Sequence, residues 1–484
     1  MAESRKKFIT DFLISTLPKL VNKLRGIILI PVVTKIIDSG AYGLWTNFAI
    51  GLTLVSSVAS LSLGAATNKL LVDASEERIR GEFWAIIVVT FIVAVIVGGF
   101  MMLLQNPIAI VAFGGKEQSH LVVILAGVLL FSLFTRQSTQ FYRSQRRMTV
   151  FAGVKSVRSV GEILVIIVAA IRFESILAIF VAYLLFHVVL SIVLGGYVVA
   201  DFGVARPNFE RIDHYLRFGV PLIATGMMYW VVNVSDRYLI TYFHNVDVTG
   251  GYAVVYATAS GLSIVSLAIG TVLFPDLASL HENNNIKEYR RRLSSVLEYF
   301  LILSIPATIG LIVIADPLLR VLSSTTVQGY TDLMYLLAPA MLAYGLFNIL
   351  IQTLLSDGQS RGSAVLWTAV AIVNIGANFV LVPTYAATGA SISTLGSLVF
   401  GLAVVVVWKR KRFTISLRVL SKVLIASALM GGAVRGIQPI VHTPALVGLP
   451  ILVATGIIVY GTFGFLMGFL TKEDVLFVKE AIAS

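Results

Sequence analysis

Long apolar stretches recur along the whole chain, and short polar links separate them. Each stretch holds about 20 residues, enough for a helix to cross the hydrocarbon core of a membrane at about 1.5 Å per residue. The pattern predicts an all-α polytopic membrane protein with about fourteen transmembrane helices. The predicted spans are 12–36, 43–71, 84–104, 121–142, 150–171, 175–199, 216–243, 249–280, 294–314, 331–355, 363–382, 388–408, 415–435 and 447–470.

Composition supports the same class. Of the 484 residues, 57% are hydrophobic and 13% are charged, and the mean hydropathy is +0.90. A soluble domain of this length does not need so much apolar surface. The first apolar run is too long for a secretory signal and lacks a clear small-residue cleavage site, so we expect it to be retained as a span.

Basic residues in the loops indicate the orientation, because Lys and Arg next to a span resist translocation. With the N-terminus inside, the loop cations that face outward are Lys116, Arg172, Arg320 and Arg435. Both termini are therefore predicted to be cytoplasmic, in the plasma (inner) membrane. The same bias explains the formal net charge of +12 without a nucleic-acid partner. Cysteine is absent, which excludes disulfides and thiolate metal sites.

Two pairs of stretches repeat at a nearly constant offset. DSGAYGLW, in residues 38–45, resembles VTGGYAVV, in residues 248–255, and the match aligns a glycine and a tyrosine in each. Further on, SQRRMTVFAGVKSV, from Ser144, has the same place and polarity as SDGQSRGSAVLWTA, from Ser356. With six spans on each side, these matches favour an internal duplication.

The duplication predicts two six-helix lobes and two extra helices. The N-terminal lobe is 1–200, a cytoplasmic linker is 201–215, the C-terminal lobe is 216–412, and two extra helices with a cytoplasmic tail are 413–484. Because an even number of spans separates the repeats, an axis along the membrane normal should relate the lobes. In transporters built this way, the substrate site lies between the halves near mid-membrane.

Cations deep within predicted spans are the candidate substrate-binding residues. The first span, with LPKLVNKLRGIILIP, carries Lys19, Lys23 and Arg25, and the last two lie too deep for head groups to solvate. Lys19 and Lys23 share a helical face, whereas Arg25 points elsewhere, so either the helix bends near Gly26 or one cation pairs with a neighbouring helix. Arg136, beside two glutamines, is a further candidate for a wet cavity.

The stretch MMYWVVNVSDRYLITYF, residues 227–243, places Asp236 and Arg237 in the middle of an apolar span. At the repeat offset they fall beside the cationic stretch of the first span. Two interpretations remain open: a structural pair with neighbouring helices, or Arg237 binding an anionic substrate while Asp236 keeps it charged and oriented. Arg158 lies four residues before Glu162, which predicts a structural ion pair. Asp236 and Glu162 are the candidate acids for ion coupling or for orienting a cation.

Five further stretches, in order along the chain, carry a resemblance to a known family. They are LRGIILIPVVTKIIDSGAYGLW at the first joint, VSDRYLITYF and TGGYAVVYA in the second lobe, LFPDLASLHENN closing the eighth span, and DGQSRGSAVLWTAVAIVNIGANFVLVPTYAATGASISTLGS across spans eleven and twelve. Over most of the first twelve spans the chain resembles the polysaccharide-biosynthesis exporters. These are the Wzx-type flippases of the multidrug/oligosaccharidyl-lipid/polysaccharide exporter (MOP) superfamily.

The resemblance implies a flippase rather than an enzyme, working by alternating access through a central cationic cavity. The implied substrate is a lipid-linked oligosaccharide on an isoprenyl phosphate or pyrophosphate, whose oxygens accept charge-assisted hydrogen bonds from Arg and Lys. Implied partners are membrane lipids and the glycosyltransferases and polymerase of the same pathway, and a monomer is expected. No cofactor is implied, and coupling to a Na⁺ or H⁺ gradient is left open.

Two other functions remain as alternatives. A cation-coupled multidrug exporter of the same superfamily places carboxylates in its cavity, whereas the deep charges here are mostly cations. A membrane-bound polysaccharide polymerase or ligase is expected to carry a sizeable outer loop, and the outer loops here, 105–120 and 315–330, are short. The histidines, among them His187, lack metal-ligand spacing, so neither a metal site nor a catalytic site is predicted.

Single introduced cysteines report the predicted topology directly, because the chain has no native cysteine. We expect the outer variants to react with an impermeant thiol reagent in intact cells, and the inner variants to react only after permeabilisation. The outer variants are Ser119→Cys, Asn245→Cys and Ser324→Cys, and the inner variants are Ser75→Cys, Asn284→Cys and Ser360→Cys. Labelling of the inner set in intact cells would contradict the orientation.

Overall fold

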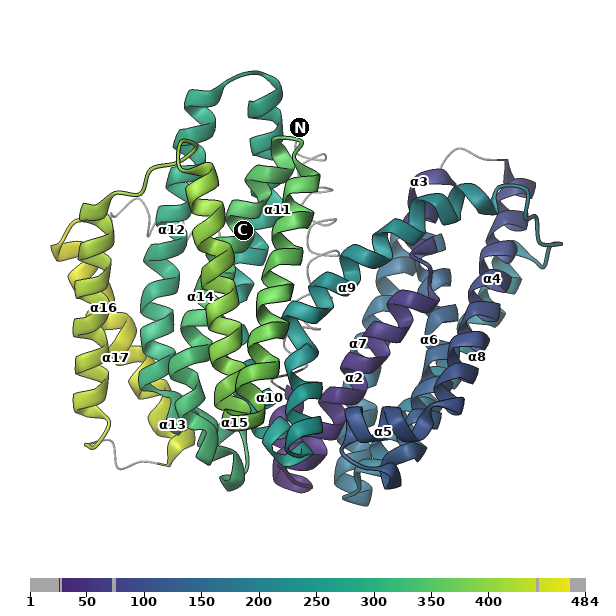
Figure 1. Cartoon of the computed structure of the whole chain (residues 1–484), viewed down its shortest axis with the longest axis horizontal. Helices are drawn as coiled ribbons and strands as arrows, with labels where there is room; N and C mark the ends of the chain where they lie inside the picture. Colours follow the sequence, from purple (N-terminus) through teal and green to yellow (C-terminus); the bar gives the residue numbers. More distant parts are fainter. Residues whose placement is uncertain (1–25, 27, 72–74, 441–443, 471–484) are drawn as a thin grey trace. The chain divides into compact units, whose positions relative to one another are not determined.

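The computed structural model describes residues 26, 28–71, 75–440 and 444–470, and within these ranges every regular element is a helix (Figure 1). The elements of the first half are α2 (Ser39–Ala59), α3 (Leu63–Leu70), α4 (Glu76–Leu103), α5 (Gln105–Phe113), η1 (Lys116–Gln118), α6 (Ser119–Ser144), α7 (Met148–Phe173), α8 (Ile176–Phe202), α9 (Ile212–Phe243) and α10 (Val246–Ser260). Those of the second half are α11 (Ser263–Glu282), α12 (Ile286–Val313), α13 (Ala315–Leu322), η2 (Thr325–Leu333), α14 (Met334–Ser356), α15 (Ser360–Lys409), α16 (Leu417–Ile437) and α17 (Ala445–Leu466).

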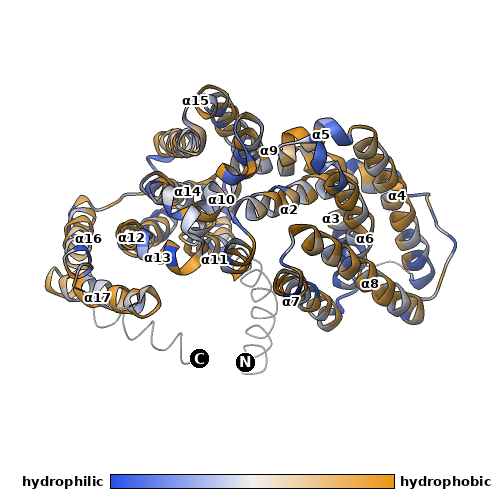
Figure 2. Cartoon of the chain, turned by 90° about the horizontal axis from the view of Figure 1, so that it is seen from below, coloured by the Kyte–Doolittle hydropathy of each residue, from blue (hydrophilic) through white to orange (hydrophobic). Residues whose placement is uncertain are grey.

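The helices occupy the predicted spans from 43–71 onward, and hydrophobic residues predominate along most of them (Figure 2). On α4 and α8, for example, Ile96, Leu103 and Ile192 are more than 60% exposed. A long helix that shows such side chains outward is stable only against lipid. The prediction of an all-α, multi-pass membrane protein is confirmed.

The number of spans stays a prediction. Eight of the described helices are long and apolar enough to cross a membrane, or nine if the bent pair of α2 and α3 is one span. Helix α7, which coincides with the predicted span 150–171, carries more charge than this criterion allows, with Lys155, Arg158 and Glu162. The first predicted span, 12–36, lies mostly outside the described residues.

The chain divides into two compact units, Met1–Ala253 and Val254–Ser484. In the first unit α4 packs on α6, α6 on α8, α7 on α8, and α9 on α2, α3 and α5. In the second unit α14 packs on α11 and α15, α12 packs on α16, and α16 pairs with α17. The lobe boundaries predicted from the duplication remain predictions.

Aromatic side chains hold α2 against α8 in the first unit. The rings of Trp45 and Tyr183 meet edge to face at 5.2 Å between centroids, and those of Phe48 and Phe180 lie 4.6 Å apart. Rings in these arrangements gain about 0.5–1.5 kcal/mol beyond the area they bury. The two contacts set the separation of the helices that border the cavity described below.

Two predicted spans are broken. Span 43–71 bends by 50° between α2 and α3, where Leu61 and Ser62 adopt positive φ angles of 48° and 50°. Span 249–280 is likewise divided into α10 and α11. Hydrophobic periodicity reports the length and face of a helix but not such breaks, because single serine or glycine residues do not interrupt a long apolar run.

The predicted linker, 201–215, lies along the beginning of α4. Its Gly203 carbonyl accepts a hydrogen bond from Trp84 at 3.2 Å, and the backbone N–H of Asn208 donates to the Gly81 carbonyl at 2.9 Å. At its end, the Tyr215 hydroxyl donates to the buried carboxylate of Glu82 at 2.5 Å. These bonds tether the linker to the helices of the first unit.

The two glycine-containing stretches of the duplication touch each other within the first unit. A Cβ on Gly43 of α2 would overlap the carbonyl oxygen of Val246, and a Cβ on Gly250 of α10 would overlap that of Ser39. Only a residue without a side chain permits this approach, as at other close helix crossings in membranes. Gly43 and Gly250 therefore serve the close packing of α2 on α10.

Gly250→Ala should destabilise the protein by about 1–3 kcal/mol, the usual cost of forcing a methyl group into a packed contact. We expect a lower melting temperature when the folded fraction is followed by fluorescence-detected gel filtration after heating. Gly99→Ala is the matched control, because nothing lies within 4 Å of a Cβ at this helical position. Equal melting of the two variants would show that α2 and α10 can separate without cost.

Candidate functional site

A cavity of about 620 Å³ lies among α2, α6, α7, α8 and α9 of the first unit. Helices α2, α6, α7 and α9 contribute residues at helical spacing, so each presents one face to the cavity, and α8 contributes Tyr183. On α6 these are Ser132, Arg136, Thr139 and Gln140, which follow one another at intervals of i, i+4, i+7 and i+8. A polar stripe on an otherwise apolar membrane helix indicates a water-accessible wall.

Helix α7 supplies the densest charge of this wall. Lys155, Arg158, Ser159 and Glu162 all line the cavity, again at helical spacing. The side chain of Arg136 on α6 is exposed although it lies in the middle of a long helix, because it projects into the cavity. Three cations from two helices therefore border the same space.

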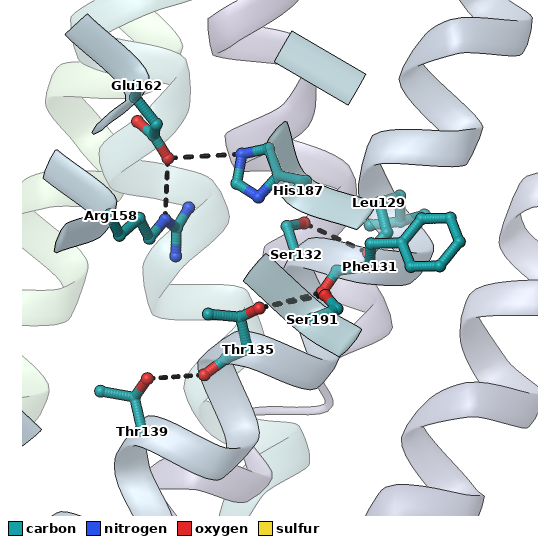
Figure 3. Close-up of polar contacts among 9 residues, drawn as sticks. All are labelled: Leu129, Phe131, Ser132, Thr135, Thr139, Arg158, Glu162, His187 and Ser191. Atoms are coloured by element: carbon teal, nitrogen blue, oxygen red, sulfur yellow. Dashed lines mark hydrogen bonds and ion pairs between the residues drawn. The ribbon is translucent and has the colours of Figure 1, made fainter. Parts of the chain in front are cut away.

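Arg158, Glu162 and His187 form a connected polar group (Figure 3). The Arg158 Nε donates to Glu162 Oε1 at 2.8 Å, and His187 Nε2 lies 3.3 Å from the same oxygen. Exposure falls along the series, with 33% of the Arg158 side chain accessible, 3% of Glu162 and none of His187. The cation therefore borders the cavity, the acid lies behind it, and the imidazole lies deepest.

Hydroxyl groups fix α6 against α8 next to this group (Figure 3). Ser191 donates to the Phe131 carbonyl at 2.7 Å, and its oxygen lies 3.2 Å from that of Thr135. Thr139 donates back to the Thr135 carbonyl at 2.6 Å. These hydroxyl groups donate to backbone carbonyls or to each other. They therefore hold this wall of the cavity in place without adding charge.

Asp236 and Arg237 of α9 face different surroundings. Asp236 is 2% exposed and accepts hydrogen bonds from the Tyr252 hydroxyl of α10 and from the backbone N–H of Arg237. Arg237 lines the cavity, and its guanidinium lies 5.9 Å from the centroid of the Tyr252 ring. The acid is thus part of the packing between α9 and α10, whereas the cation belongs to the cavity wall.

A second set of bonds fixes α9 on α2. The Asn47 amide donates to the Thr241 hydroxyl and to the Ala112 carbonyl, both at 2.7 Å, and the Tyr238 hydroxyl donates to the Asn47 carbonyl at 2.9 Å. Hydrogen bonds between buried polar groups rigidify a helix interface. They hold Arg237 in register with the polar stripe on α6.

The sequence-predicted residues are found in three situations. Arg136, Glu162 and Arg237 are brought together at one cavity, and Asp236 lies beside it in the packing of α9. The ion pair predicted for Arg158 and Glu162 is confirmed. The remaining candidates lie outside the described residues, namely Lys19, Lys23 and Arg25. The predicted roles in substrate binding and coupling stay predictions.

Sequence reasoning missed several residues of the wall. Lys155 is not among the residues predicted to bind substrate, but it lies inside α7 and lines the cavity. Its spacing of three residues from Arg158 was the available signal. His187 gave no signal, because its relation to Glu162 depends on the packing of α8 on α7. Among the described residues, no group of three or more His, Cys, Asp or Glu side chains could hold a metal ion.

A sequence model of the polysaccharide biosynthesis protein family matches residues 32–332 of this chain. The probable flippase AglR of Haloferax volcanii is 23% identical over 217 residues, 42% of this chain and 45% of AglR. The probable low-salt glycan biosynthesis flippase Agl15 of the same organism is 21% identical over 265 residues, 53% of this chain and 55% of Agl15. The chain therefore matches about half the length of these relatives.

Two solved structures share the fold. The lipid II flippase MurJ, in an inward closed conformation, gives a TM-score of 0.75 at 15% identity, over 94% of this chain and 98% of MurJ. An inward-facing multidrug resistance MATE family transporter of the MOP superfamily gives 0.64 at 14% identity, over 83% of this chain and 98% of that one. At these identities the likeness concerns the fold.

Tyr252→Phe should lower the stability by about 1.5–3 kcal/mol, because it removes a hydrogen bond to a buried carboxyl group. The measurement is the melting temperature, obtained by heating the protein and following the folded fraction by fluorescence-detected gel filtration. Tyr335→Phe is the matched control, since Tyr335 is 59% exposed. If both variants melt like the parent protein, Asp236 does not depend on the Tyr252 hydroxyl.

Proposed function

Because the chain belongs to the polysaccharide biosynthesis protein family, we propose that it is a flippase for lipid-linked oligosaccharides. The substrate is an isoprenyl phosphate or diphosphate that carries a glycan. Its polar head crosses the cytoplasmic membrane by alternating access, while the protein keeps both termini in the cytoplasm. The two flippase relatives and the MurJ-like fold support this class of activity.

The observation that carries the proposal is the charge of the cavity. Arg136, Lys155, Arg158 and Arg237 border it, and the only carboxylate among its described lining residues is Glu162. Each cation costs roughly 2.5–3.5 kcal/mol to place at mid-membrane on insertion scales. Cations retained at such a cost in a polar cavity indicate an anionic ligand, and guanidinium groups match phosphate oxygens in geometry and charge.

The rest of the wall suits a glycan. Thr46, Thr53, Ser56 and Gln140 supply hydroxyl and amide groups, and the aromatic rings of α2 and α8 add apolar faces. The volume of about 620 Å³ falls within the roughly 300–1,000 Å³ of ordinary ligand pockets. The isoprenyl tail would stay in the lipid. Lys19, Lys23 and Arg25 of the first predicted span remain candidates for the same head group.

We expect the substrate to come from glycosyltransferases of the same pathway and to be consumed by its polymerase, with the flippase acting as a monomer. A multidrug resistance MATE family transporter shares the fold, so a cation-coupled multidrug exporter remains the alternative. Such a protein needs negative charge for cationic drugs, and the net charge of the described cavity wall has the opposite sign.

The direct test is flipping in proteoliposomes. The probe is an isoprenyl-diphosphate-linked N-acetylglucosamine with a nitrobenzoxadiazole label on the sugar. Dithionite does not cross the membrane, so it reduces only the label in the outer leaflet. A flippase brings the probe of the inner leaflet within its reach, and the fraction of label protected from reduction disappears. Ethidium uptake by the same vesicles reports the alternative. Ethidium transport without loss of probe protection would favour the drug exporter.

Arg136→Ala and Arg237→Ala should each slow flipping about tenfold or more, since a hydrogen bond to a charged group contributes about 1.5–3 kcal/mol. Arg172→Ala is the matched control, because Arg172 is exposed at the end of α7 and lies away from the cavity. Folded protein is quantified by gel filtration before reconstitution. Normal flipping by both well-folded cavity variants would exclude them from binding the head group.

A further inference from the structure

The polar stripes that line the cavity continue beyond it, toward the joint between α6 and α7. On α6, Arg143 follows the lining residues Arg136 and Gln140 at helical spacing, so it lies on the same face of the helix. On α7, Phe151 precedes the lining residue Lys155 by one turn and shares its face in the same way. We call Arg143, Phe151 and Lys155 the joint cluster.

One aromatic ring lies against both cations of the joint cluster. The guanidinium carbon of Arg143 lies 5.7 Å from the centroid of the Phe151 ring, and the Lys155 Nζ lies 5.1 Å from the same centroid. Phe151 is buried, whereas Arg143 is exposed and Lys155 is half-buried. Because the electron-rich face of a ring attracts cations, Phe151 offsets part of the repulsion between the two side chains.

The joint itself fixes the position of Arg143. The backbone N–H of Arg146 donates to the Arg143 carbonyl, and that of Arg147 donates to the Tyr142 carbonyl, both at 3.0 Å. The Arg147 side chain forms an ion pair with Asp201 in the last turn of α8. Arg147 therefore fastens the joint to α8 and has its charge compensated there, whereas Arg143 lies on the face that leads to the cavity.

Cations follow one another from the joint into the cavity. Lys155 belongs both to the joint cluster and to the cavity wall, and it lies one turn from Arg158 on α7. Arg143 lies two turns from Arg136 on α6. Charges of one sign along a wall with apolar surroundings focus the electric field and draw an anion along it.

We propose that Arg143 and Lys155 form an entry site for the phosphate groups of a lipid-linked head group, which then passes to Arg158 and Arg136. This entry site rests on the proposed function, because it needs an anionic substrate in the cavity. The ligand is an isoprenyl phosphate or diphosphate. Arg143 contacts it on the way in and is left behind in the final complex, so Arg143 contributes to the rate of binding and not to the rate of release.

Stopped-flow fluorescence with the purified, full-length protein separates these two rates. The probe is geranyl diphosphate with a dansyl label on the geranyl chain, which accepts energy from the tryptophans of the protein, among them Trp45 in the cavity wall. Association is measured at low and at high salt. Dissociation is measured by displacement with unlabelled geranyl diphosphate, and gel filtration confirms that each variant is folded.

Arg143→Gln should slow association about fivefold at low salt and change dissociation by less than about twofold, because the lost cation acts before the probe is bound. High salt should reduce the difference from the parent protein, since ions screen an exposed charge. Arg143→Lys keeps the charge and should associate like the parent. Arg206→Gln is the matched control, because Arg206 is an exposed arginine of the linker along α4, and it should also behave like the parent.

Arg136→Ala should show the opposite signature, with dissociation about tenfold faster, because Arg136 holds the head group in the cavity. Faster dissociation of Arg143→Gln would make Arg143 part of the final complex and overturn the entry role. Unchanged association of Arg143→Gln, or equal slowing by Arg206→Gln, would also overturn it. These outcomes leave the flippase proposal intact, whereas absence of probe binding by the parent protein would overturn both.

Inorganic diphosphate distinguishes a lipid-linked head group from a soluble anion of the same chemistry. The isoprenyl tail concentrates geranyl diphosphate in the detergent micelle around the protein, so inorganic diphosphate should compete with the probe about tenfold more weakly than unlabelled geranyl diphosphate. Equal competition by the two compounds would assign the entry site to soluble anions and overturn its role for a lipid-linked substrate.

Discussion

The close crossing of α2 and α10 is the contact on which the cavity wall depends. Gly43 and Gly250 bring the two backbones together at a distance that no Cβ permits. This approach places Tyr252 where its hydroxyl reaches Asp236, and the acid is then held away from the cavity. Arg237, the next residue along α9, consequently turns to the cavity. The close packing at Gly43 and Gly250 therefore leaves Arg237, and not Asp236, facing a ligand in the cavity.

The wall also shows how a membrane protein keeps several cations together. Arg136 and Lys155 face the accessible space of the cavity, where water or an anion can solvate them. Arg158 instead shares its charge with Glu162, which in turn is in contact with His187. The neutral hydroxyl pairs between α6 and α8 add rigidity without adding further charge. The cations can therefore lie close together, because Glu162 balances the charge of Arg158 while water or an anion solvates Arg136 and Lys155.

Apolar runs and charge depth predicted much of this arrangement. The helices lie where the runs indicated, because in lipid a helix must satisfy all its backbone groups internally and its length is set by the membrane. Arg136 and Arg237 were identified by depth alone. The bend at Leu61 was not predicted, since the serines beside it are too few to interrupt the long apolar run. Nor was the contact of His187 with Glu162, because it depends on how two helices pack and not on spacing within one.

A transporter must release what it binds, and this requirement gives the acid among the cations a physical meaning. A wall of permanent cations alone would hold a diphosphate tightly on both sides of the membrane, because Arg keeps its charge at any physiological pH. Glu162 is an internal competitor for one of these cations, at 2.8 Å from Arg158. In the proposed flippase, Glu162 therefore lowers the positive charge that a phosphate meets at Arg158, and so limits how tightly the cavity binds it.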